Sequence, residues 1–221
     1  MAPFIIFGCG GHSRSVTDIL LSYRKDLSPV FIDEGAQVGE KLYGFPILSK
    51  IEGELGEFFF GIGNNEKRKA KYEEMGTSRL ISIVSPYSYR GRESTLGKGV
   101  FIGNFSHIGP EAYIGDNTIV NNGATIEHEV VVGSHCHIGP RAVISGRCKI
   151  GDLVFVGVGA VIKDSISICS HVGIGAGAVI VKDITEPGVY IGCPGKKYEK
   201  ESIKNLSLLS LPCGVENKGY L

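Results

Sequence analysis

The sequence predicts two folded parts in series: a small α/β domain built on a parallel sheet, followed by a parallel β-helix. Two observations lead to this prediction. A strand, a glycine-rich turn, a helix and a second strand follow one another between Pro3 and Glu34. From Val100 to Asp183, a six-residue repeat continues without a gap. A length of 221 residues is enough for both parts.

Composition and charge narrow the class of protein. The 32 glycines are roughly twice the usual share. A hydrophobic content of 43% with 21% charged residues describes a globular protein and excludes disordered and collagen-like chains. Basic and acidic residues balance at 23 each, so no nucleic-acid partner is expected. We expect a cytoplasmic protein without membrane insertion, because no apolar run approaches about 18 residues and the start lacks a signal-peptide pattern.

The α/β elements come first. Residues 3–12 are predicted to form a strand that runs into a glycine-rich turn, and helical spacing follows over residues 13–26. A second strand at 30–34 ends in two acids, and a third at 57–63 precedes a helix that Asn64 or Asn65 would cap. This order is typical of a Rossmann-like nucleotide pocket.

The glycine-rich turn departs from the full dinucleotide fingerprint. It has Gly8, Gly10 and Gly11, but Ser13 stands where the third glycine would fall. A tight strand-to-helix turn without a ligand is therefore the alternative. A domain of about 90 residues is also too short for a complete nicotinamide-dependent dehydrogenase.

The repeat predicts the second part. Its fourteen blocks all have Ile or Val at the third position, and Gly follows that residue in eight of them. One β-branched and one small residue per block is the pattern of a β-helix with flat sides. If three blocks make one coil, equivalent positions of successive coils stack about 4.8 Å from each other. Fourteen blocks then give four to five coils, with the left-handed turn known for hexapeptide repeats.

One block breaks the pattern and marks the candidate chemistry. In ATIEHE the corner glycine is replaced by Glu127, followed by His128 and Glu129. Imidazole is a base near neutral pH, and a carboxylate on its second nitrogen would fix its tautomer. A solvated surface pair is the alternative, and His135, His137 and His171 compete as the base.

Spacing separates two of these histidines. His137 follows His128 by one and a half blocks, so the two should lie on different sides of one β-helix and meet only across a subunit interface. No metal is expected, because the histidine-rich segment lacks a second cysteine pair at zinc-site spacing. Cys136 and Cys148 occupy the small first position of their blocks and are interpreted as buried fillers.

Several segments together resemble a known family. They are IIFGCGGHSRS at the start, FIDE at 31–34, FFFGIGNNEKRKAKY at 58–72, ATIEHEVVVGSHCHIG and VYIGCPGKK. Over residues 3–197 the chain resembles the bacterial hexapeptide-repeat acetyltransferases of the sialic acid O-acetyltransferase group, most closely the UDP-4-amino-sugar N-acetyltransferases of bacillosamine-type sugar biosynthesis.

The resemblance implies a set of roles. His128 would be the general base and Glu129 would orient it, with direct attack on acetyl-CoA and no acyl-enzyme. For the acetyl donor it implies His137, Val158 and Ala176. For the nucleotide sugar it implies contacts from both parts of the chain: Gly10, Gly11, His12, Asp33, Glu34, Gly63, Asn64 and Asn121. It also implies a homotrimer with its sites at the subunit interfaces.

These expectations divide the chain and leave alternatives open. The predicted units are a nucleotide-sugar-binding domain at 1–92, an acyltransferase β-helix at 93–197 and a C-terminal tail at 198–221, where an apolar patch has no assigned role. O-acetylation of sialic acid or another surface-polysaccharide sugar is the alternative within enzymes. A non-catalytic scaffold or sensor is the alternative of another class.

Overall fold

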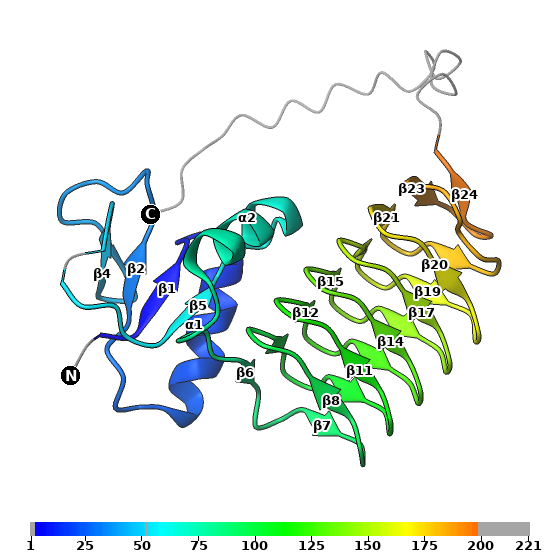
Figure 1. The fold of residues 1–221 in the computed structure, drawn as a ribbon, viewed down its shortest axis with the longest axis horizontal. Coiled ribbons are helices and arrows are strands. Elements are labelled where there is room, and N and C mark those ends of the chain that lie inside the picture. Colours follow the sequence, from blue (N-terminus) through cyan, green and yellow to red (C-terminus); the bar gives the residue numbers. More distant parts are fainter. Residues whose placement is uncertain (1–2, 52, 199–221) are drawn as a thin grey trace, which may run out of the picture.

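A computed structural model describes residues 3–51 and 53–198, so the leucines of the predicted tail patch lie outside the described residues. Figure 1 shows the coils of the β-helix stacked along one axis, with the α/β domain beside them. The predicted fold class is confirmed. The sheet of the α/β domain has five strands: β1 (Ile5–Phe7), β2 (Val30–Ile32), β3 (Lys41–Leu42), β4 (Phe45–Leu48) and β5 (Phe58–Phe60).

The order of these strands creates a crevice. It is β3-β4-β2-β1-β5, and the central strand β1 is parallel to both β2 and β5. The chain leaves β1 toward β2 on one side and returns to β5 on the other, which is the switch point where ligands bind in open parallel sheets. The hairpin β3–β4 was not predicted, because its strands are short and its turn is only Tyr43 and Gly44, both at positive φ.

Two helices flank the sheet: α1 (Gly11–Tyr23) and α2 (Asn65–Met75). Helix α1 begins slightly earlier than predicted, because Gly10 takes the extended N-cap conformation inside the glycine-rich turn. Asn64 is the cap of α2, and its side chain accepts a hydrogen bond from the Lys67 amide at 3.0 Å. Both helix N-termini therefore lie next to the carboxyl ends of parallel strands.

Three parallel sheets form the sides of the β-helix. Sheet I has eight strands: β6 (Ile83–Val84), β9 (Phe101–Ile102), β12 (Ile119–Val120), β15 (His137–Ile138), β18 (Phe155–Val156), β21 (Val172–Ile174), β23 (Gly188–Ile191) and β24 (Lys196–Lys197), the last antiparallel. Sheet II has six: β7 (Tyr89–Arg90), β10 (His107–Ile108), β13 (Thr125–Ile126), β16 (Val143–Ile144), β19 (Val161–Ile162) and β22 (Val179–Ile180). Sheet III has five: β8 (Thr95–Leu96), β11 (Tyr113–Ile114), β14 (Val131–Val132), β17 (Lys149–Ile150) and β20 (Ser167–Ile168).

The register confirms the predicted coil of three blocks. Thr125 pairs with Val143 and Ile126 with Ile144, and the partners in each pair are three blocks apart in the sequence. The repeated Ile and Val side chains point inward and form the core, together with Cys136 and Cys148, which are buried fillers as predicted.

The corner glycines are required by the close approach of neighbouring coils. At the eight glycines that follow the inward residue, an added Cβ would come within 2.7 Å of another atom, in most cases in the next coil: Gly103, Gly109, Gly115, Gly133, Gly139, Gly151, Gly157 and Gly175. The glycine excess therefore follows from packing.

The β-helix starts earlier than the predicted boundary at residue 93. Strand β6 already pairs with β9, and Tyr89 of β7 pairs with His107. The repeat is hidden there because Arg90 occupies the inward position that Ile or Val fills later. Its side chain lies at the open end of the coil and donates to the Ser94 carbonyl at 2.9 Å.

The outward face of sheet I carries the α/β domain. Phe101 and Ile119 pack in one cluster with Phe4, Ile6 and Val16. At the other side of this contact Arg68 of α2 is 1% exposed, and burial lowers its pKa to about 10. Its guanidinium donates at 2.9–3.2 Å to oxygens of both parts: the carbonyls of Ile62, Gly63, Asn117, His135 and Cys136, and Asn65 Oδ1. The two parts are thus fixed relative to each other.

Within residues 3–51 and 53–198, no helix has the length and apolar character needed to cross a membrane.

Candidate active site

A cavity of about 900 Å³ lies at the carboxyl ends of β1, β2 and β5; we call it the N-terminal pocket. Seven of the predicted substrate-binding residues line it: Gly10, Gly11, His12, Asp33, Glu34, Gly63 and Asn64. Helix N-termini carry partial positive charge and unsatisfied N–H groups, so the pocket suits an anionic ligand such as a diphosphate.

Asp33 is held by the turn that it faces. Its Oδ2 accepts from the Cys9 amide at 3.1 Å and from the Cys9 thiol at 3.2 Å, and its Oδ1 accepts from the Gly35 amide at 3.1 Å. These bonds outweigh the partial burial of the carboxyl and lower its pKa. Asp33 is therefore an anion that fixes the glycine-rich turn, and its neighbour Glu34 is largely exposed, 4.0 Å from Lys71.

His12 and His137 meet where the pocket reaches sheet I, with ring centroids 6.0 Å apart. Burial lowers the pKa of His12 to about 3 and that of His137 to about 4, so both rings are neutral. His137 Nδ1 donates to the Gly63 carbonyl at 3.1 Å, and the Asn121 amide donates to its Nε2 at 3.2 Å. Asn121 and His137 are thus brought together, one side chain away from the pocket.

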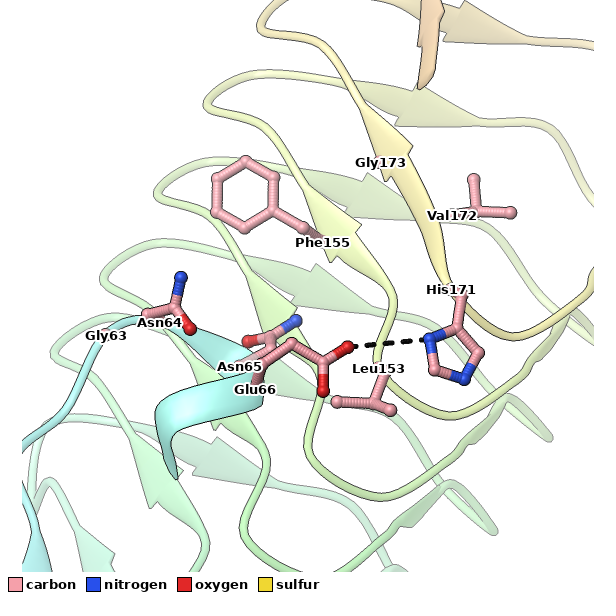
Figure 2. A pocket seen from close by; sticks show the side chains of 9 residues that line it. All are labelled: Gly63, Asn64, Asn65, Glu66, Leu153, Phe155, His171, Val172 and Gly173. Atoms are coloured by element: carbon pink, nitrogen blue, oxygen red, sulfur yellow. Dashed lines mark ion pairs between the residues drawn. The ribbon is translucent and has the colours of Figure 1, made fainter. Parts of the chain in front are cut away.

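A second cavity, of about 490 Å³, continues from Gly63 and Asn64 along sheet I; we call it the groove. Figure 2 shows that the start of α2 forms one side and that Phe155, Val172 and His171 form the other. His171 Nδ1 lies 3.5 Å from Glu66 across the groove. His171 is therefore tied to α2 and does not approach His128.

The His128–Glu129 pair lies at the corner between β13 of sheet II and β14 of sheet III, on a line of corners that we call edge II–III. Glu129 has φ of +58°, the left-handed conformation that recurs at the corners. This conformation turns its carboxylate back, and Oε2 lies 2.9 Å from His128 Nδ1. The contact places the ring proton on Nδ1 and leaves a lone pair on Nε2.

The free nitrogen of His128 lies over the next coil. A Cβ added at Gly146 would be 2.5 Å from His128 Nε2 and 3.1 Å from Asp164 Oδ2. Gly146 therefore makes room for the imidazole. Asp164 is held by Arg147 at 2.9 and 3.0 Å and by the Ser165 hydroxyl at 2.6 Å.

The site residues fall into two groups within one chain. The pocket, His137 and Asn121 lie on or beside sheet I, and Val158 and Ala176 lie at the corners between sheets I and II, which form edge I–II. The His128–Glu129 pair, which we call the dyad, lies on edge II–III. Sheet II lies between the dyad and the residues of edge I–II. The prediction that His128 and His137 lie on different sides is confirmed, because His137 is in β15 of sheet I and His128 is in the turn between β13 and β14.

Sequence reasoning missed four cationic residues of this region. Lys50, Lys67 and Lys71 line the N-terminal pocket, and Arg68 joins it to the β-helix. The sequence did contain a signal for the lysines. Lys50 follows β4, and Lys67 and Lys71 lie one helical turn apart in the helix that follows β5. Among the residues that the structure describes, there is no group of three or more His, Cys, Asp or Glu that could hold a metal ion.

Family comparisons match both parts of the chain. The PglD N-terminal domain matches residues 3–75. The bacterial transferase hexapeptide repeats match residues 93–128, 113–146 and 129–164.

Solved structures match the whole arrangement. A histidine mutant of perosamine N-acetyltransferase from Caulobacter crescentus, solved with CoA and GDP-perosamine, is 28% identical; the match covers 90% of this chain and 98% of that one, with a TM-score of 0.81. The acetyltransferase domain of PglB from Neisseria gonorrhoeae, with acetyl coenzyme A, is 26% identical over 89% of this chain and 98% of that one, with a TM-score of 0.81.

A curated relative matches more narrowly. An uncharacterised protein of Acanthamoeba polyphaga mimivirus is 33% identical over 98 residues, which are 42% of this chain and 20% of that protein. The chain thus spans about a fifth of the length of this relative.

The fold and these matches define an acyltransferase of the hexapeptide-repeat class. Within that class the chain resembles the sugar N-acetyltransferases of these solved structures, and it combines a match to the PglD N-terminal domain with matches to the hexapeptide repeats.

Proposed function

We propose that the protein transfers the acetyl group of acetyl-CoA to the amino group of a UDP-linked 4-amino-4,6-dideoxy sugar. The observation that carries the proposal is the 2.9 Å contact between His128 Nδ1 and Glu129, which leaves Nε2 as a base over Gly146. The N-terminal pocket supplies a site of nucleotide size in the same chain. The relatives solved with CoA and GDP-perosamine support an amino sugar as acceptor.

The chemistry is a direct transfer. The neutral amine attacks the thioester carbonyl, a C–N bond forms and the C–S bond breaks. His128 Nε2 takes the proton that the amine loses, and Glu129 stabilises the resulting imidazolium. The CoA thiolate leaves and is protonated in turn. Cys136 and Cys148 are buried and take no part.

A second copy of the chain completes the site, as a homotrimer. Within one chain sheet II separates the dyad from the residues of edge I–II, so the two groups meet only between subunits. The outward row of sheet II supports such an interface, because it consists of uncharged side chains apart from a histidine: Tyr89, His107, Thr125, Val143, Val161 and Val179.

The ligand contacts follow the two groups. Gly10 and Gly11, at the start of α1, would bind phosphate, with His12 as a neutral hydrogen-bonding neighbour and Lys67 supplying charge. The base and ribose would lie toward Asp33 and Glu34, next to the Gly63–Asn64 segment. Asn121 would contact the sugar, and three residues would contact the acetyl donor: His137, Val158 and Ala176.

The nucleotide distinguishes two candidate substrates. The resemblance to bacillosamine-type enzymes favours UDP. GDP is the second candidate, because relatives of 26–28% identity were solved with GDP-perosamine.

A panel of acceptors tests the proposal. Purified protein and acetyl-CoA are mixed with the UDP-linked and the GDP-linked 4-amino-4,6-dideoxy sugar, free sialic acid and CMP-sialic acid, and CoA thiol and product mass are measured. We expect thiol release and a gain of one acetyl group with the UDP-amino sugar. Silence on both amino sugars with turnover of a sialic acid would contradict the proposal and favour O-acetylation. Turnover of the GDP-linked sugar alone would keep the reaction and change the nucleotide.

A further inference from the structure

A carboxylate lies near the edge of the imidazole that carries its free nitrogen. The position of a Cβ added at Gly146 is 2.5 Å from His128 Nε2, 2.6 Å from His128 Cε1 and 3.1 Å from Asp164 Oδ2, so the imidazole edge and the carboxylate are neighbours. Asp164 belongs to the corner two coils beyond His128, and the imidazole reaches it by lying over the intermediate coil. A charged group that binds to Nε2 is therefore within the electrostatic range of Asp164.

This carboxylate is held in place by three contacts. Arg147 donates to both of its oxygens, at 2.9 and 3.0 Å, and the Ser165 hydroxyl donates to Oδ1 at 2.6 Å. The Ser165 hydroxyl and the Arg147 guanidinium lower the pKa of Asp164, so it is ionised at neutral pH. Exposed ion pairs of this kind add little stability, so folding alone gives little reason for the arrangement.

The charge of the proposed acceptor gives a reason. A primary amine carries a proton in neutral water, since unperturbed amino groups titrate above pH 7. It therefore approaches the site as a cation and must lose that proton before it can attack. A sugar hydroxyl approaches as a neutral group. A fixed carboxylate near Nε2 attracts the ammonium group by its charge, whereas the neutral hydroxyl gains no such attraction.

We propose that Asp164, positioned by Arg147 and Ser165, binds the ammonium group of the acceptor beside His128 and makes the site selective for amines over hydroxyls. This rests on the proposed function and deepens it. Glu129 keeps its contact with Nδ1 and orients the base, whereas Asp164 acts on the other side of the ring, where the substrate arrives.

Equilibrium binding separates this role from effects on the base. Titration calorimetry without acetyl donor, and hence without turnover, compares the UDP-linked 4-amino sugar with its 4-hydroxy counterpart. The variants are Asp164→Asn, which removes the charge, and Asp164→Glu, which keeps it. The control is Glu186→Gln, which removes another exposed acid paired with a lysine, 2.7 Å from Lys197 and in the segment between β22 and β23. Thermal melting checks that each variant folds.

We expect Asp164→Asn to weaken binding of the amino sugar by about fivefold, the scale of an exposed charge pair. Binding of the hydroxy sugar should stay unchanged, and Asp164→Glu and Glu186→Gln should keep the preference for the amine. Equal losses for both sugars, or no loss for the amino sugar, would overturn the proposal. Failure of the proposed function is a different result, because wild-type protein would then bind and acetylate no amino sugar.

Discussion

The N-terminal pocket and the dyad differ in how much of a site one chain builds. The pocket lies between the ends of three strands and the starts of two helices, and its glycine-rich turn is fixed by Asp33. The dyad lies on an open corner, where the His128 side chain is 41% exposed and only Nδ1 is hydrogen-bonded, to the Glu129 carboxylate, among the contacts of the described residues. Under the proposed function, ligand recognition is thus largely formed in one chain, whereas the reaction centre needs a second surface.

The strongest test of this difference is His128→Asn. Loss of the general base should reduce kcat by about 10²–10⁴-fold, while binding of the nucleotide sugar to the pocket stays close to wild type. Steady-state kinetics and calorimetry measure the two effects. The control is His171→Asn, which removes another corner histidine with a carboxylate partner, Glu66, and should leave kcat unchanged. Full activity of His128→Asn would show that another group is the general base.

The pocket side is tested by Arg68→Met. The substitution removes the donor for five backbone carbonyls in a buried junction, and unsatisfied buried acceptors should lower the free energy of unfolding by about 3 kcal/mol. Urea unfolding measures this change, with Lys69→Met, at a half-exposed position of the same helix, as the control. Nucleotide-sugar binding should weaken too, because Gly63 loses its contact with Arg68. A stability equal to that of wild type would show that the junction does not depend on Arg68.

The smallest of these three expected effects is that of Gly146→Ala. Its Cβ would lie 2.5 Å from His128 Nε2, so the ring must move. Misplacing a base by a fraction of an ångström should lower kcat by about tenfold, with stability and nucleotide binding little changed. Gly173→Ala is the control, since its Cβ would meet nothing closer than 3.6 Å. A kcat equal to that of the control would mean that the ring is mobile at its corner.

The repeat made the β-helix predictable, and departures from the repeat limited the prediction. Inward Ile and Val with corner glycine determine coil, register and core, because only these residues fit where neighbouring coils approach so closely. The first coil was missed because Arg90 stands at an inward position at the open end, where a long polar side chain can still reach solvent.

Some residues of the candidate site could likewise be predicted from a pattern in the sequence, and others could not. The pocket residues could be predicted from their place after parallel strands, and the dyad from the missing glycine at Glu127. The role of Arg68 could not, because it lies within a run of charged helical residues and three of its six acceptors come from the distant β-helix. Likewise, only the left-handed φ of Glu129 shows that its carboxylate turns back to His128.

The period of three blocks also determines where each residue lies on the surface of the β-helix. Positions 128, 146, 164 and 182 share one line along the molecule, so the number of a residue gives its place on the surface. An insertion of one whole coil would lengthen the line and leave each position on it. An insertion of a single block would move every later position to the next line and separate Asp164 from His128. Lineages of such proteins can therefore change length in whole coils, while smaller changes in this part of the chain must be absorbed in the corners.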